Sequence, residues 1–117
     1  MDVDRILKQF NKFADERDWD QFHTIKNLSM ALSVESSELL ELFQWAKEEE
    51  ILDWVKNDQK KKQQISEEVA DIFMYLLKIA DKAEINLESA IQDKMKKNAE
   101  KYPVEKAKGN AKKYNEL

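Results

Sequence analysis

Two pairs of acidic residues, each with a spacing of three, are the part of this sequence best suited to chemistry. Glu35 and Glu38 form the first pair, and Glu68 and Asp71 form the second. Residues three apart in a helix lie on the same side, so each pair presents two carboxylates in one direction. Two such helices facing each other would bring four hard oxygen donors together. That donor set, with no soft ligand, suits Mg²⁺, or Mn²⁺ in its place.

The first pair interrupts an apolar stripe. With an advance of about 100° per residue, Glu35 falls inside the stripe of the helix predicted over residues 27–46, and Glu38 lies on its edge. An unpaired carboxylate in an apolar interior costs on the order of a few kcal/mol, so such a group is protonated, paired or bound to a cation. The stripe consists of Leu28, Ala31, Leu32, Leu39, Leu42, Phe43 and Ala46.

The second pair is less unusual by itself. In the helix predicted over residues 58–82, Glu68 flanks the apolar stripe and Asp71 lies further round, beside Tyr75. A solvated helix face would explain this pair alone. The metal site therefore depends on these two helices facing each other. The second stripe consists of Ile65, Val69, Ile72, Phe73, Leu76, Ile79 and Ala80.

The composition favours helices as the elements that position these acids. One glycine and one proline among 117 residues leave little turn chemistry for a sheet, and 42% of the residues are hydrophobic. We predict an all-α fold, a compact bundle of four to five helices, in a single domain over residues 1–117 with a polar tail at 103–117. Further helices are predicted over 2–17, around 51–55, and from an Asn86 cap to about residue 101.

The charge and the cysteine content exclude several functional classes. A net charge of −4 disfavours nucleic acid as a partner, because such binding needs a basic surface. The absence of cysteine excludes disulfides and thiolate metal sites. The start of the chain does not resemble a signal peptide, and no apolar run approaches the ~20 residues of a membrane span. We therefore expect a cytoplasmic protein without a membrane partner.

The two acidic pairs resemble the signature of a known family, the MazG-like all-α nucleoside triphosphate pyrophosphohydrolases. That signature is Glu-x-x-Glu followed by Glu-x-x-Asp, which here reads Glu35-Ser-Ser-Glu38 and Glu68-Val-Ala-Asp71. Three further segments are similar to the dCTP pyrophosphatase branch: residues 17–23, residues 38–45, and residues 94–103. Family members often carry proline where this chain has Ile25.

The resemblance implies hydrolysis of a nucleoside triphosphate, with dCTP or a related deoxynucleotide as the leading substrate, to a monophosphate and pyrophosphate in nucleotide-pool cleaning. Magnesium held by the four acids would neutralise the phosphates and activate a water molecule. Either Glu35 or Glu38 would act as the general base.

Other residues would bind the rest of the nucleotide. Lys94, Asn98 and Lys101 or Tyr102 repeat on one helix face and are candidates for phosphate binding, with a solvated lysine face as the alternative. Aromatic groups offer stacking surface for the base and a contact for the sugar, although each of them is also a candidate for core packing. These residues are Trp19, Phe22, His23 and Trp45 for the base, and Tyr75 for the sugar.

Apolar residues behind the main stripes predict self-association. Met30, Leu40, Met74 and Leu77 would be exposed in an isolated bundle, so we expect a homodimer or a dimer of dimers. Two other interpretations stay open, a non-catalytic helical oligomerisation module and a nucleotide-binding regulator. A di-iron bundle is disfavoured because it uses Glu-x-x-His motifs, and His23 lies in none.

Overall fold

The computed structural model describes residues 1–117 and confirms the all-α fold, with six α-helices and two 3-10 turns. Contacts along the chain divide it into two compact units, Met1–Glu84 and Ile85–Leu117, which are described separately below. That residues 1–117 act as one domain stays a prediction. The elements are α1 (Val3–Glu16), η1 (Asp20–Phe22), α2 (Ile25–Phe43), α3 (Glu48–Asn57), α4 (Gln59–Lys82), α5 (Leu87–Lys101), α6 (Val104–Ala107) and η2 (Tyr114–Glu116).

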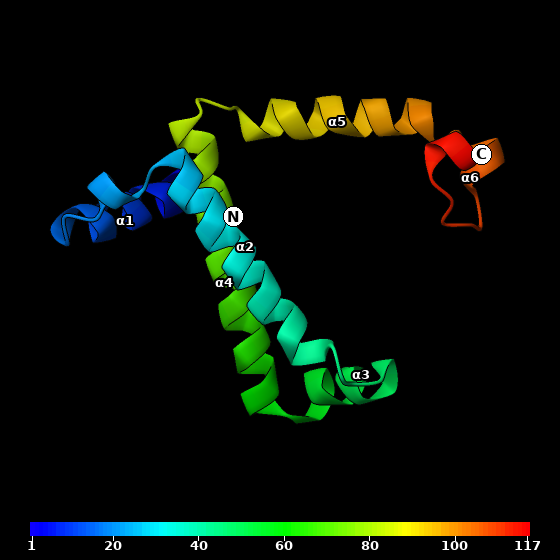
Figure 1. The fold of residues 1–117 in the computed structure, drawn as a ribbon, viewed down its shortest axis with the longest axis horizontal. Coiled ribbons are helices and arrows are strands. Elements are labelled where there is room, and N and C mark those ends of the chain that lie inside the picture. Colours follow the sequence, from blue (N-terminus) through cyan, green and yellow to red (C-terminus); the bar gives the residue numbers. More distant parts are fainter. The chain divides into compact units, whose positions relative to one another are not determined.

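The first unit is built on the pair formed by α2 and α4, which lie side by side along their length (Figure 1). The short helix α3 joins them at one end and packs on α4. At the other end α1 packs on α4 and on η1. The prediction that the two acid-bearing helices face each other is therefore confirmed.

Side-chain caps start the long helices, and the cap at Asn86 is the predicted one. Thr24 Oγ1 accepts a hydrogen bond from the Asn27 amide at 3.1 Å, and Asn86 Oδ1 accepts one from the Ser89 amide at 3.0 Å. Such caps satisfy amides that have no partner inside the helix. Helix α2 ends at Phe43, three residues before the predicted end at Ala46, because the chain turns at Gln44 to begin α3.

The buried side of α4 differs from the predicted stripe. Leu77, expected to face another subunit, is only 3% exposed, whereas Leu76, expected in the core, is 43% exposed. Helix α4 packs against α1 and α3 as well as α2, so its buried side turns toward α1 near its C-terminal end. Of the other three residues expected at a subunit contact, Met30 and Leu40 are exposed and Met74 is partly buried.

The second unit consists of α5 and a tail that folds back on its end. The tail, predicted as merely polar, contains the one-turn helix α6 directly after Pro103. The rings of Tyr102 and Tyr114 meet edge to face with centroids 6.4 Å apart, and Lys101 Nζ lies 4.9 Å from the Tyr114 ring centroid.

No helix in either unit combines the length and the apolar character that crossing a membrane requires.

Candidate functional site

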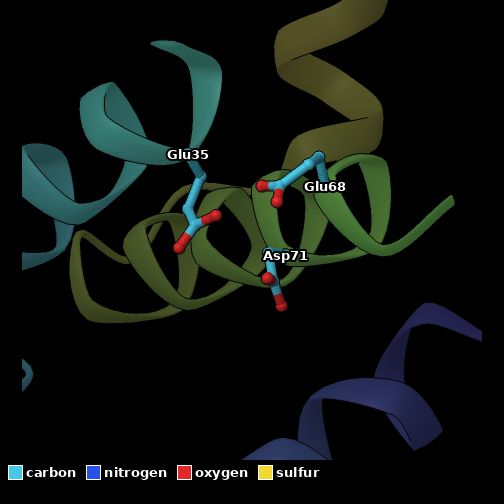
Figure 2. Close-up of side chains that lie close together, drawn as sticks. All are labelled: Glu35, Glu68 and Asp71. Carbon is cyan, nitrogen blue, oxygen red and sulfur yellow. The ribbon is translucent and has the colours of Figure 1, made fainter. Parts of the chain in front are cut away.

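Three of the four predicted acids meet between α2 and α4. Glu35, Glu68 and Asp71 each offer one carboxylate oxygen within 4.8 Å of the others. Figure 2 shows Glu35 reaching from α2 toward the two acids of α4, and the Glu68 carboxylate pointing back toward it. All three residues are partly buried. The helix pairing therefore turns two separate sequence motifs into one acidic cluster.

Glu38 lies beside this cluster without joining it. It is exposed on α2, one turn after Glu35, and it is close enough to Glu35 to affect the protonation of that residue. One carboxylate of the predicted four therefore lies outside the cluster, at an exposed position.

Two carboxylate oxygens of the cluster accept no hydrogen bond. Glu35 Oε2 and Glu68 Oε2 are enclosed by protein and find no donor. Burying an acceptor without a partner is costly, and burying two ionised ones near each other is more so. A proton or a cation between α2 and α4 would satisfy both. The residues therefore fit a hard divalent metal ion, because carboxylate oxygens are the donors such ions prefer.

The protonation of Glu35 reflects the same crowding. A hydrogen bond with Glu68, followed by burial and by the nearby Glu38 and Asp71, raises the pKa of Glu35 to about 7 from its ordinary value of 4.5. Like charges disfavour the ionised form, and so does loss of water. Without a cation, the cluster holds a proton at Glu35 under mildly acidic conditions.

A cavity of about 220 Å³ opens next to the acids. Helix α1, the η1 segment and α4 each supply part of its wall. Asp71 belongs both to the cavity and to the acidic cluster, so the two features form one continuous site. The lining residues are Phe10, Phe13, Trp19, His23, Asp71, Met74 and Tyr75.

The aromatic rings of the cavity contact one another. His23 stacks on Phe10 with ring centroids 5.7 Å apart, and Trp19 meets Phe13 edge to face at 5.6 Å. Tyr75 approaches Phe10 edge to face at 6.4 Å. Such walls offer flat apolar surface to a planar ring.

Two polar groups complete the cavity. Burial, then the positive charge of Lys78, lowers the pKa of His23, so its imidazole is neutral at pH 7, and His23 Nδ1 is enclosed without a partner. Burial, then the charges of Glu35 and Asp71, raises the pKa of Tyr75. Its hydroxyl therefore keeps its proton and can donate a hydrogen bond.

The remaining predicted residues lie elsewhere. Phe22 and Trp45 are exposed, Trp45 at 90%, and neither lines the cavity. The four residues predicted to bind phosphate, which are Lys94, Asn98, Lys101 and Tyr102, belong to the second unit, where all four are exposed. Their role, like that of the acids, stays a prediction.

Three residues of the cavity wall were not predicted to bind a ligand. They are Phe10 and Phe13, in the first predicted helix, and Met74, which was predicted to lie at a subunit contact. An apolar residue that lines a cavity has the same periodicity as one in a core, so the sequence carries no signal that separates the two.

Two long helices that gather acidic side chains beside an aromatic cavity define an all-α protein equipped to hold a cation close to a planar ligand. The chain belongs to the MazG-like family, whose model matches residues 30–117.

Individual relatives agree with this assignment. Over 91 residues, covering 76% of the chain, it is 41% identical to dCTP pyrophosphatase 1 from Bos taurus and 38% identical to dCTP pyrophosphatase 1 from Homo sapiens. The match covers 52% of each relative, so the chain spans about half the length of these proteins. A crystal structure of a pyrophosphatase from Archaeoglobus fulgidus superimposes with a TM-score of 0.79 at 39% identity, covering 88% of this chain and 94% of that one.

Proposed function

We propose that this protein is a metal-dependent nucleoside triphosphate pyrophosphohydrolase that converts dCTP or a related deoxynucleotide to its monophosphate and pyrophosphate. The observation that carries the proposal is the convergence of Glu35, Glu68 and Asp71 within 4.8 Å beside an aromatic cavity. The activities for which the relatives are named, dCTP pyrophosphatase and pyrophosphatase, support the substrate class and the bond that breaks.

The acidic cluster would hold Mg²⁺, with Mn²⁺ as a substitute. When bound, the metal supplies positive charge that neutralises the phosphates and makes the α-phosphorus more electrophilic. Glu35, Glu68 and Asp71 are the residues that would hold it, and Glu38 is a fourth donor at the solvent edge. The two enclosed oxygens without donors support this assignment.

Glu38 is the best placed general base. It is the one acid of the two motifs outside the three-carboxylate cluster, and it lies one helical turn from Glu35. Water attacks the α-phosphorus, the bond to the bridging oxygen of the β-phosphate breaks, pyrophosphate leaves, and Glu38 accepts the proton of the water. Glu38→Gln should therefore lower kcat by about 100-fold or more.

The cavity would bind the nucleoside. Its aromatic wall stacks on a base, His23 and Tyr75 offer hydrogen-bonding groups, and Asp71 places the acids at one end of it. A cavity of about 220 Å³ favours the single ring of a pyrimidine over the double ring of a purine. Lys94, Asn98, Lys101 and Tyr102, all exposed in the second unit, remain the predicted phosphate donors.

A panel of nucleotides tests the proposal. Purified protein with Mg²⁺ is incubated with each of the four dNTPs and four NTPs, and pyrophosphate and monophosphate are measured. We expect release from dCTP to be the fastest, and Glu35→Gln and Glu68→Gln to abolish it. Metal binding by calorimetry, which does not depend on activity, should be lost in the same variants. Turnover of no nucleotide, or full activity in both variants, would contradict the proposal.

We further propose that the protein acts as a homodimer or a dimer of dimers. Val34 on α2, and Val69 and Leu76 on α4, are exposed apolar residues, and the exposed Trp45 follows α2. A surface of this kind favours association with a second copy. Light scattering at micromolar concentration tests this. Leu76→Asp should shift the mass toward a monomer, and a monomeric wild-type protein would refute the idea.

A further inference from the structure

Lys78 is the one charged residue that the fold buries, at 2% exposed. It lies on α4, one turn after Met74 and Tyr75, both of which line the cavity. A lysine this deeply enclosed is rare unless its ammonium group has partners. Nothing in the reaction assigned above uses it, so its burial needs a separate explanation.

Lys78 contacts residues of α1 and η1, the two other segments that supply the cavity wall. Its Nζ donates a hydrogen bond to Asn11 Oδ1 on α1, lies 3.6 Å from Asp20 Oδ1 in η1, and stands 5.8 Å from the centroid of the Phe10 ring. A single atom of α4 therefore contacts both α1 and η1.

These partners adjoin the rings of the cavity directly. Asn11 follows Phe10, and Asp20 lies between Trp19 and His23. His23 in turn stacks on Phe10. Moving Asp20 away from α4 would move Trp19 and His23 with it, because only one to three residues separate them.

The neighbouring Lys82 provides an internal comparison. It reaches the same Asp20 Oδ1 at 2.8 Å, but its side chain is 29% exposed and no hydrogen bond or ion pair joins it to α1. The hydrogen bond with Lys82 and the attraction of both lysines hold the pKa of Asp20 below its usual range. An exposed pair of this kind contributes little to stability.

We propose that Lys78 is a positioning residue for the nucleotide cavity, an anchor on α4 that fixes η1 and α1 so that Trp19 and His23 stay opposite Tyr75. The proposal rests on the proposed function only for the statement that the cavity takes a nucleotide. A hydrophobic residue would fill the same space at little cost in stability, because a buried ion pair gains little over apolar packing. The buried ammonium instead provides directional contacts, which fix one geometry.

The test compares Lys78→Met with the matched variant Lys82→Met. Methionine replaces the apolar stem of lysine, one atom shorter, and removes the charge. In the full-length protein with Mg²⁺ we expect Lys78→Met to raise KM for dCTP about tenfold with kcat changed by less than about twofold. Amide hydrogen exchange over residues 17–24 should rise in the same variant without nucleotide. Lys82→Met should leave KM and this exchange within about twofold of wild type.

Asp20→Asn provides a second route if Lys78→Met does not fold. It keeps the size of the side chain and removes its negative charge, and we expect it to reproduce the rise in KM and in exchange over residues 17–24. Unchanged KM and unchanged exchange in the folded variants, or a loss confined to kcat, would overturn the proposal. So would equal effects of Lys78→Met and Lys82→Met. Failure of the wild-type protein to hydrolyse any nucleotide refutes the proposed function, while the exchange measurement still decides whether Lys78 anchors η1.

Discussion

Glu35 of α2 and Glu68 of α4 are neighbours, and each has one buried carboxylate oxygen that accepts no hydrogen bond. In the absence of a cation, a proton on Glu35 lowers the negative charge between the two side chains. The affinity of this site for protons and its affinity for metal ions are therefore linked.

The stability of the metal-free protein should fall as the pH rises. The pKa of Glu35 is about 7 in the folded chain, against 4.5 for an ordinary glutamate. Between these values the folded state holds a proton that the unfolded state has lost, so the stabilisation is complete below pH 4.5 and disappears as the pH passes 7. We expect a loss of about 1–3 kcal/mol, measured by urea unfolding with EDTA.

The matched control for this prediction is Glu41→Gln, at an exposed position of the same helix. Glu35→Gln should make the free energy of unfolding nearly independent of pH over this range, whereas Glu41→Gln should leave the pH dependence of the wild-type protein unchanged. If the free energy of unfolding changed equally with pH in Glu35→Gln and in the wild-type protein, a group other than Glu35 would be responsible for the change.

Metal ions should stabilise the protein more at high pH than at low pH. A cation must displace the proton on Glu35, so Mg²⁺ or Mn²⁺ at about 100 times its Kd should add about 2.7 kcal/mol at pH 8 and much less at pH 5.5. Thermal unfolding with and without the metal measures the difference. Glu68→Gln should remove most of the effect. Glu67→Gln, a charge-matched change at the adjacent exposed position, should retain it.

Trp19 should contribute to nucleotide affinity through its ring. Trp19→Leu keeps an apolar side chain and removes the stacking surface, so KM for dCTP should rise about tenfold, corresponding to about 1.4 kcal/mol. The control is Trp54→Leu, because the ring of Trp54 packs under Lys61 and does not line the cavity. Equal KM values in the two variants would place the base elsewhere.

Glu84 should tolerate glycine with a gain in stability. Its φ angle is 56°, in the left-handed region that a side chain disfavours, and it follows the last turn of α4. Glycine adopts this conformation freely, so Glu84→Gly should raise the free energy of unfolding by about 0.5–1 kcal/mol. Asp81→Gly, inside the same helix, should lower it by about 1 kcal/mol. A lower free energy of unfolding in Glu84→Gly would mean that the Glu84 side chain makes a stabilising contact.

The local features of this protein could be predicted from its sequence. Asn86 caps its helix as predicted, and the placement of Glu35 within an apolar stripe pointed to an acidic site. Both inferences depend on residues within about one helical turn of each other, where geometry follows directly from the helical repeat. For the same reason the class of fold and the acids of the two motifs were accessible without a structure.

Only the tertiary structure decided which side of each helix is buried and which distant residues meet. It buries Leu77 and exposes Leu76, because α4 packs against α1 and α3 as well as α2, and no periodicity within α4 contains that information. It brings Phe10 to His23 and Asn11 to Lys78, contacts that join α1 to η1 and α4. The sequence thus determined the helices and the acids that they carry. The packing of α1 and α4 around η1 decided that a cavity lies beside those acids and that a buried lysine holds its wall.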